Sequence, residues 1–220
     1  MTDDSLTASP SDDPVFTETI DRAQSLLGRL WNIYAGDVTS IGPRSQPVLA
    51  YAALAFEHQE AMLVLLRQGL VGSAMTFVRL IFESTVRAGW VLGCATDDQV
   101  DAVRHDDAFR FPVMKDMAVA VETRFNLRAI FTTYVTDNWA TLNSYTHPGL
   151  RQLTARFSKI DVSPEYPPQH VVVAINGSMH WLMLLAILVL RTHGRPADAA
   201  RVETELITQY GSGRISTLPP

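Results

Sequence analysis

A cluster of polar residues stands near the middle of the chain, in LNSYTHPG (residues 142–149). Pro148 and Gly149 end a predicted helix there, and Asn143 and His147 are four positions apart, so they share one helix face. The helix dipole stabilises a charged histidine at a helix C-terminus, and such a histidine can act as a general acid or base near neutral pH. The same pattern also fits a histidine that only caps backbone carbonyls. Both interpretations stay open.

A second polar group lies in AMTFVRLIFESTVRAGW, where Arg79, Glu83 and Arg87 are spaced four residues apart. On a helix they form one stripe, in which Glu83 can pair with both arginines. The common interpretation is a ladder of ion pairs on a solvated face, which stabilises a protein only slightly. Apolar residues crowd this stripe, however, and predict that part of it faces inward. Burying an arginine–glutamate pair is costly, so a stripe of this kind is a candidate site.

Further residues could bind a ligand around these two groups. Among them, His58 interrupts an apolar run in LAFEHQEAMLVLL, and Trp90 or Trp139 could stack against a ring. The candidate catalytic residues are His147, Asn143, Arg79 and Glu83. The candidate ligand-binding residues are His58, Trp90, Tyr145 and Arg151.

The sequence offers few signs of other chemistry. It lacks the glutamate–histidine spacing of di-iron bundles and the paired histidines of metalloproteases, so no metal site is expected. It contains no Gly-x-Ser-x-Gly elbow, phosphate-binding loop or dinucleotide fingerprint, and no cofactor is expected. Cys94 is the only cysteine, which excludes an internal disulfide framework.

The elements that must position these residues are helices, because apolar residues recur at helical spacing and two-residue alternation is nearly absent. We predict an all-α, up-and-down bundle of about six to seven helices, forming one domain over residues 14–211. A disordered tail precedes it at 1–13 and a frayed tail follows at 212–220. The predicted helices begin near Pro14, Pro47, Gly72, Thr96, Arg124, Val171 and Pro196.

Prolines and glycines predict the breaks in these helices. Pro112 should kink or split the fourth helix, and the fifth should be broken near Asn126. Residues 41–47 form a predicted loop, as do residues 158–169, and Gly194 ends the apolar helix before the last one.

The composition of the chain limits the kinds of partner and the cellular location that we expect. The net charge of −5 argues against a broad basic surface for duplex DNA. The acidic N-terminus has no apolar region of a secretory signal, so we expect a cytoplasmic protein. Residues 171–190 are long enough to span a bilayer, but Asn176 and His180 lie within them. A buried core helix explains this segment better than a membrane span. The many apolar helix faces predict a homodimer.

Taken together, these residues resemble the HEPN superfamily of small α-helical bundles. HEPN proteins carry an arginine, often followed by a polar residue, and a histidine four to six positions after the arginine. In this chain Asn143 matches the polar residue and His147 matches the histidine, whereas Leu142 stands in place of the arginine. Residues of two earlier helices look like related bacterial families, at His58, Arg79, Glu83 and Trp90. The resemblance covers roughly residues 45–155.

Many HEPN proteins are dimeric, metal-independent ribonucleases of defence systems. The resemblance implies a dimer in which an arginine holds the phosphate and His147 activates the 2′-hydroxyl or protonates the leaving group. Because Leu142 cannot bind a phosphate, Arg79 or Arg151 would have to substitute.

Three hypotheses follow from the sequence. The first is a HEPN-like bacterial protein of defence or stress response, which either cuts RNA in an atypical way or binds RNA or a nucleotide without cutting it. The second is a helical module that binds a small anion, with Arg79 and His147 on the charge and a tryptophan on a ring. The third is a structural interaction protein. The first two predict that the named side chains converge on one pocket, and the third predicts that they are dispersed or paired with each other.

Overall fold

A computed structural model of the 220-residue chain describes residues 14–34, 42–147, 149–157 and 166–210; for Tyr34 and Arg151 it describes the backbone only. Both predicted tails, at 1–13 and 212–220, lie outside the described residues. Most of the loop predicted at 158–169 also lies outside them.

The described residues are helical almost throughout and contain no strand, so the predicted all-α fold is confirmed. There are more helices in this part of the chain than the six to seven predicted, because the fourth predicted helix is divided and a short helix follows His147. The helices are α1 (Pro14–Tyr34), α2 (Ser45–Arg67), α3 (Val71–Gly93), α4 (Asp97–His105), α5 (Met114–Phe125), α6 (Ile130–Thr146), α7 (Leu150–Thr154), α8 (Pro168–Thr192) and α9 (Pro196–Tyr210).

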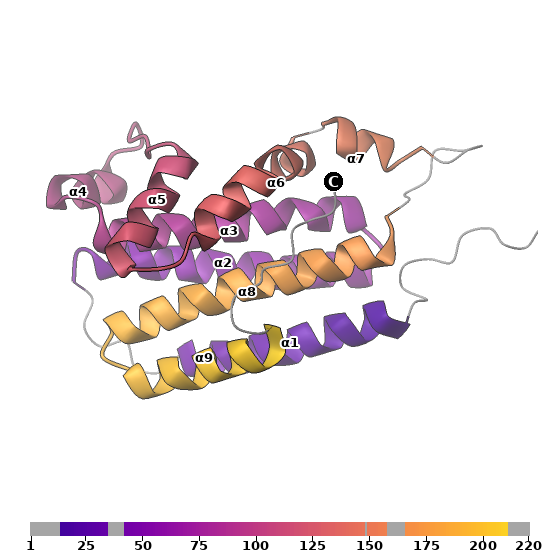
Figure 1. The fold of residues 1–220 in the computed structure, drawn as a ribbon, viewed down its shortest axis with the longest axis horizontal. Helices are drawn as coiled ribbons and strands as arrows, with labels where there is room; N and C mark the ends of the chain where they lie inside the picture. Colours follow the sequence, from indigo (N-terminus) through magenta and orange to yellow (C-terminus); the bar gives the residue numbers. More distant parts are fainter. Residues whose placement is uncertain (1–13, 35–41, 148, 158–165, 211–220) are drawn as a thin grey trace, which may run out of the picture.

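The long helices α1, α2, α3 and α8 lie side by side, α9 lies with α1 and α8, and α4, α5, α6 and α7 lie beyond α3 (Figure 1). α8 packs against α1, α2, α3 and α9, which makes it the central helix of the bundle. α3 contacts α2 and α8 on one side and α5 and α6 on the other. Because α3 is shared by both groups of helices, it presents residues to two different regions of the molecule.

Local signals set several helix boundaries. Thr96 begins α4 with a capping box: its hydroxyl accepts the Gln99 amide, and the Gln99 side chain accepts the Thr96 amide. The break predicted at Pro112 is wider than a kink, since α4 ends at His105 and α5 begins only at Met114. Asn126 adopts the left-handed conformation (φ 51°) and ends α5, as the break predicted there requires.

The connection between α5 and α6 is held by one carboxylate. Glu122 of α5 is buried, and it accepts the backbone N–H groups of Phe131 at 2.6 Å and Thr132 at 2.9 Å. The Thr132 hydroxyl donates to the other carboxylate oxygen at 2.8 Å. These bonds satisfy amides at the start of α6 that have no partner within the helix, and the negative charge is favourable at this end of the dipole.

Aromatic rings form the centre of the core. Trp181 of α8 is fully buried and contacts the rings of Phe82, Phe131 and Tyr134. Burial raises the pKa of Tyr134 to about 12, so this phenol stays neutral.

Within the described residues, α2 and α8 are long and apolar enough to cross a membrane by length and composition alone. α8 is mostly covered by other helices, as predicted for a core helix. α2 is covered on one side, and Leu54 and Val64 on its other side are exposed.

Candidate functional site

The stripe on α3 forms two ion pairs that share one carboxylate. Arg79 Nε donates to Glu83 Oε1 at 2.6 Å, and Arg87 Nη2 lies 2.9 Å from Glu83 Oε2. The side chains of Glu83 and Arg79 are only 9% and 18% exposed, whereas that of Arg87 is 35% exposed. The stripe therefore faces other helices over most of its length and is not the fully solvated ladder of the alternative interpretation.

Each guanidinium of the stripe lies over an aromatic ring. Arg79 Cζ is 4.8 Å from the centre of the Trp139 ring on α6, and Arg87 Cζ is 5.0 Å from the centre of the Phe111 ring. Such arrangements stabilise a cation, more strongly where water is partly excluded. Glu83 and the two rings thus hold both arginines in fixed positions.

His147 joins the cluster from the end of α6. Its Nε2 atom is 3.4 Å from Arg79 Nη1, across 68 positions of sequence. Its backbone N–H donates to the carbonyl of Asn143, so it also caps the helix. We call Arg79, Glu83, Arg87, Trp139 and His147 the arginine cluster.

A pocket of about 410 Å³ adjoins the arginine cluster. Arg87 and Arg110 bring positive charge to it, and Trp139 belongs to both the cluster and the pocket wall. Pockets of this size take small organic ligands. The residues lining the pocket are Arg87, Phe109, Arg110, Phe111, Pro112, Met114, Met117 and Trp139.

The charges at the arginine cluster leave it open to an anion. Two guanidiniums and one carboxylate carry a formal charge of +1, and Arg110 adds another at the pocket. The Nε atom of Arg87 is buried and has no hydrogen-bond partner within the described chain. Tyr51 lies close enough to affect this charge, and burial raises its pKa although Arg87 acts in the opposite direction. Guanidinium forks next to flat rings suit a ligand that combines an anionic group with a ring.

The structure brings together three of the four candidate catalytic residues, namely Arg79, Glu83 and His147. Asn143 lies one turn before His147 and is half-buried, but its side chain makes no hydrogen bond within the described residues. Leu142, at the position of the missing arginine, is completely buried, so it belongs to the core.

The candidate ligand-binding residues do not join the arginine cluster as a group. His58 packs against the ring of Phe77, with centroids 5.4 Å apart, and burial lowers its pKa. Phe77 and Arg79 are two positions apart on α3 and so point to nearly opposite sides, which places His58 away from the arginine cluster. The side chain of Arg151 lies outside what the structure describes.

Trp90 and Tyr145 pack near the arginine cluster but do not belong to it. Trp90 is buried against Phe111, with ring centroids 5.8 Å apart, and so lies behind one wall of the pocket. Tyr145 is half-buried against the core, and its carbonyl accepts the hydroxyl of Thr76 at 3.1 Å.

The segment FRFP, residues 109–112, supplies a wall of the pocket that sequence reasoning did not predict. Two aromatic residues around an arginine, placed before a helix-breaking proline, were a visible signal. Their position over Arg87 depends on how the connection between α4 and α5 returns to α3, which no local pattern specifies.

No group of three or more histidine, cysteine, aspartate or glutamate side chains suited to a metal ion occurs in the described part of the chain.

The fold and the site define an all-α protein whose central helices carry a buried carboxylate between two arginines that lie over aromatic rings. The chain belongs to the family of unknown function DUF6988, whose model matches residues 52–211. The arginine cluster and the pocket beside it lie within the matched residues. No curated protein and no solved structure matches the chain. The resemblance to the HEPN superfamily stays a prediction.

Proposed function

We propose that this protein binds a nucleotide or the phosphate and base of a single-stranded RNA at the arginine cluster and the adjoining pocket. The phosphate lies against Arg87 and Arg110, and the base stacks beside Trp139 or Phe111. One observation carries this proposal: Arg79 and Arg87 are held over aromatic rings beside a pocket of about 410 Å³. Cation and ring together recognise both parts of a nucleotide.

Glu83 tunes the affinity of this site. A bare pair of arginines would bind any anion strongly, whereas the carboxylate cancels one of the two charges. The ring is then needed as well as the phosphate, which favours a nucleotide over inorganic phosphate.

Binding of AMP and of a short single-stranded RNA, measured by isothermal titration calorimetry, tests the proposal. We expect Arg87→Gln and Trp139→Leu each to weaken binding about tenfold, or about 1.4 kcal/mol. Arg67→Gln is the matched control, because Arg67 is also an ion-paired arginine, with Asp21 at 2.6 Å, but lies on α2 outside the site. If neither AMP nor the RNA binds, or if Arg67→Gln weakens binding as much as Arg87→Gln does, the arginine cluster has only a structural role.

Metal-independent cleavage of RNA is a second candidate function, favoured by the contact between Arg79 and His147. In this proposal Arg79 of α3 takes the role of the arginine missing at position 142, because its Nη1 atom lies 3.4 Å from His147 Nε2. In this scheme Arg79 holds the scissile phosphate, and His147 removes the proton of the 2′-hydroxyl or protonates the leaving oxygen.

Cleavage of a labelled RNA in the presence of EDTA distinguishes the two functions. Loss of cleavage in both His147→Ala and Arg79→Ala, with retention in His105→Ala, supports catalysis. His105 is an exposed histidine on α4. Binding without cleavage by the wild type restricts the protein to a binding or regulatory role.

We also propose that the protein is a cytoplasmic homodimer. Leu54 and Val64 on the outer face of α2 are exposed apolar residues that a second copy would cover. Light scattering after size exclusion is expected to give twice the chain mass of 24.4 kDa. A single-chain mass at micromolar concentration would contradict the dimer.

A further inference from the structure

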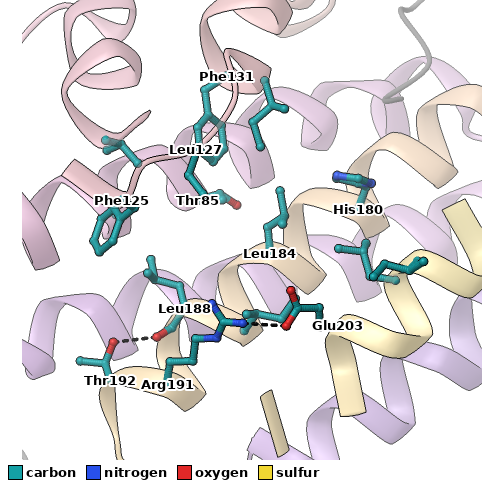
Figure 2. A pocket seen from close by; sticks show the side chains of 16 residues that line it. Thr85, Phe125, Leu127, Phe131, His180, Leu184, Leu188, Arg191, Thr192 and Glu203 are labelled. Carbon is teal, nitrogen blue, oxygen red and sulfur yellow. Dashed lines mark hydrogen bonds and ion pairs between the residues drawn. The ribbon is translucent and has the colours of Figure 1, made fainter. Parts of the chain in front are cut away.

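A second, larger cavity lies on the opposite side of α3 from the arginine cluster. Thr85 and Gly89 face it, whereas Glu83 and Arg87, each two positions away from one of them, face the arginine cluster. Its volume is about 580 Å³, within the range of ligand sites. Helices α5, α6, α8 and α9 complete its wall, chiefly with valine, leucine, isoleucine and phenylalanine side chains. Figure 2 shows these side chains around the opening.

Polar groups occur at two ends of this cavity. Along α8, His180, Leu184, Leu188 and Thr192 line successive turns, so the cavity extends about 18 Å along the helix. Near Thr192, Arg191 and Glu203 form an ion pair of 2.6 Å, with side chains 58% and 44% exposed (Figure 2). This end meets solvent, and its charges neutralise each other.

His180 is the polar group at the other, buried end. The residue is only 5% exposed, and its ring lines the cavity without a hydrogen bond to another described residue. The ring contacts Trp181 and Tyr210 edgewise, with centroids 5.5 Å and 6.1 Å away. An imidazole therefore lines an apolar cavity with its donor and its acceptor both unused.

The charge state of His180 follows from its surroundings. Burial lowers its pKa to about 4, so the ring is neutral at physiological pH and offers one N–H donor and one nitrogen acceptor. Burial also raises the pKa of the neighbouring Tyr210 to about 12, which keeps that phenol uncharged. Burial is what lowers the pKa of His180, whereas the charges of Arg22 and Glu205 act in opposite directions on the pKa of the adjoining Tyr210.

We propose that this cavity is a binding site for an elongated, uncharged apolar molecule whose single hydroxyl or carbonyl group hydrogen-bonds to His180. The apolar body replaces water against the leucine and isoleucine side chains, which supplies most of the affinity. The hydrogen bond gives the His180 imidazole a partner that no described residue supplies. A carboxylate binds poorly, because its charge meets a neutral ring in an apolar enclosure.

Two probes separate the apolar body from the polar group. The fluorescent hydrocarbon 1,6-diphenyl-1,3,5-hexatriene is elongated and has no polar atom, so its emission reports occupancy of the cavity alone. The alcohol 1-decanol is expected to displace it, and decanoate to displace it about tenfold less well. Failure of the hydrocarbon to bind the wild type, or equal displacement by decanoate, overturns the proposal.

Variants locate the probes within the cavity. Leu184→Trp fills the space and should abolish the fluorescence increase; Ile207→Trp, on the more exposed α9 side, repeats the test if the first variant does not fold. His180→Phe should keep the hydrocarbon and weaken displacement by decanol about tenfold. His58→Phe, the same change in a half-buried histidine elsewhere, should behave as wild type. Unchanged hydrocarbon binding in a folded tryptophan variant, or unchanged decanol affinity in His180→Phe, contradicts the site.

Discussion

Polar groups on the two sides of α3 differ in whether they have partners. On one side, Glu83 is paired with both Arg79 and Arg87, and each arginine lies over a ring. On the other side, His180 reaches an apolar cavity with no hydrogen-bond partner in the described residues and is kept neutral by burial. A helix turns by about 100° per residue, so positions two apart can belong to regions of contrasting chemistry.

The contrast shows how charge is accommodated in a small bundle. Glu83 lies in ion pairs with Arg79 and Arg87, whereas His180 has no ion pair within the described chain and burial lowers its pKa, so its imidazole is neutral. Exposed ion pairs such as Arg191 with Glu203 differ from both cases, because water solvates their charges and the pairing adds little stability.

Removing the shared carboxylate should have the largest effect on stability. Glu83→Gln leaves two partly buried arginines without their counter-charge, and we expect a loss of about 3 kcal/mol in the free energy of unfolding. Urea denaturation at neutral pH measures this loss. A loss below about 1 kcal/mol would mean that the arginine cluster behaves as surface ion pairs do.

Acid should weaken the fold through His180. Because the folded pKa is about 4 and the ordinary value is 6.5, the unfolded chain takes up a proton first as the pH falls. Stability is therefore fully present above pH 6.5, declines between 6.5 and 4, and levels off below 4. At pH 5 this single group removes about 2 kcal/mol. His180→Phe should lose that much less stability between pH 8 and pH 5 than the wild type; equal losses would contradict a buried neutral ring.

The hydroxyl of Thr85 should have a smaller effect. Thr85 is buried at the cavity wall, and its hydroxyl donates to the carbonyl of Ile81 at 3.0 Å and lies 3.3 Å from that of Trp181. Thr85→Val keeps the shape and removes these bonds, for an expected loss of about 1 kcal/mol in chemical denaturation. Tighter binding of the hydrocarbon probe should accompany this loss, because the wall becomes more apolar.

The exposed ion pair at the mouth of the cavity should contribute least. Glu203→Gln makes the same chemical change as Glu83→Gln, but Arg191 and Glu203 are about half exposed, so the expected loss is under about 0.5 kcal/mol. The ratio of the two losses, measured side by side, is a direct measure of how differently the protein surrounds these carboxylates.

Local sequence predicted much of the fold. Thr96, Asn126 and Gly194 mark helix ends through capping and left-handed conformations, which depend on neighbouring residues only. The pairing of Glu83 with both arginines also followed from their spacing along α3. The split at Pro112 was expected, but its length was not, because residues 106–113 are shaped by their packing on α3.

The candidate site could be predicted only in part. Arg79, Glu83 and His147 were named from residue type and spacing, but the meeting of Arg79 with His147 depends on how α6 lies against α3. His58 was expected beside them, yet the packing of α2 turns it towards Phe77. The unpaired state of His180 requires the enclosing positions of α5, α6 and α9, and no pattern within α8 contains that information.

The carboxylate of Glu122 has a consequence for hydrogen exchange. It holds the amide protons of Phe131 and Thr132, at the first turn of α6, where amides ordinarily exchange with solvent almost freely. Those two amides should exchange as slowly as amides in the middle of the helix. Glu122 belongs to α5, so these amides can exchange only when α5 and α6 separate. Their exchange rate therefore measures how often α6, which carries Trp139 near its C-terminal half and ends before His147, moves away from α5.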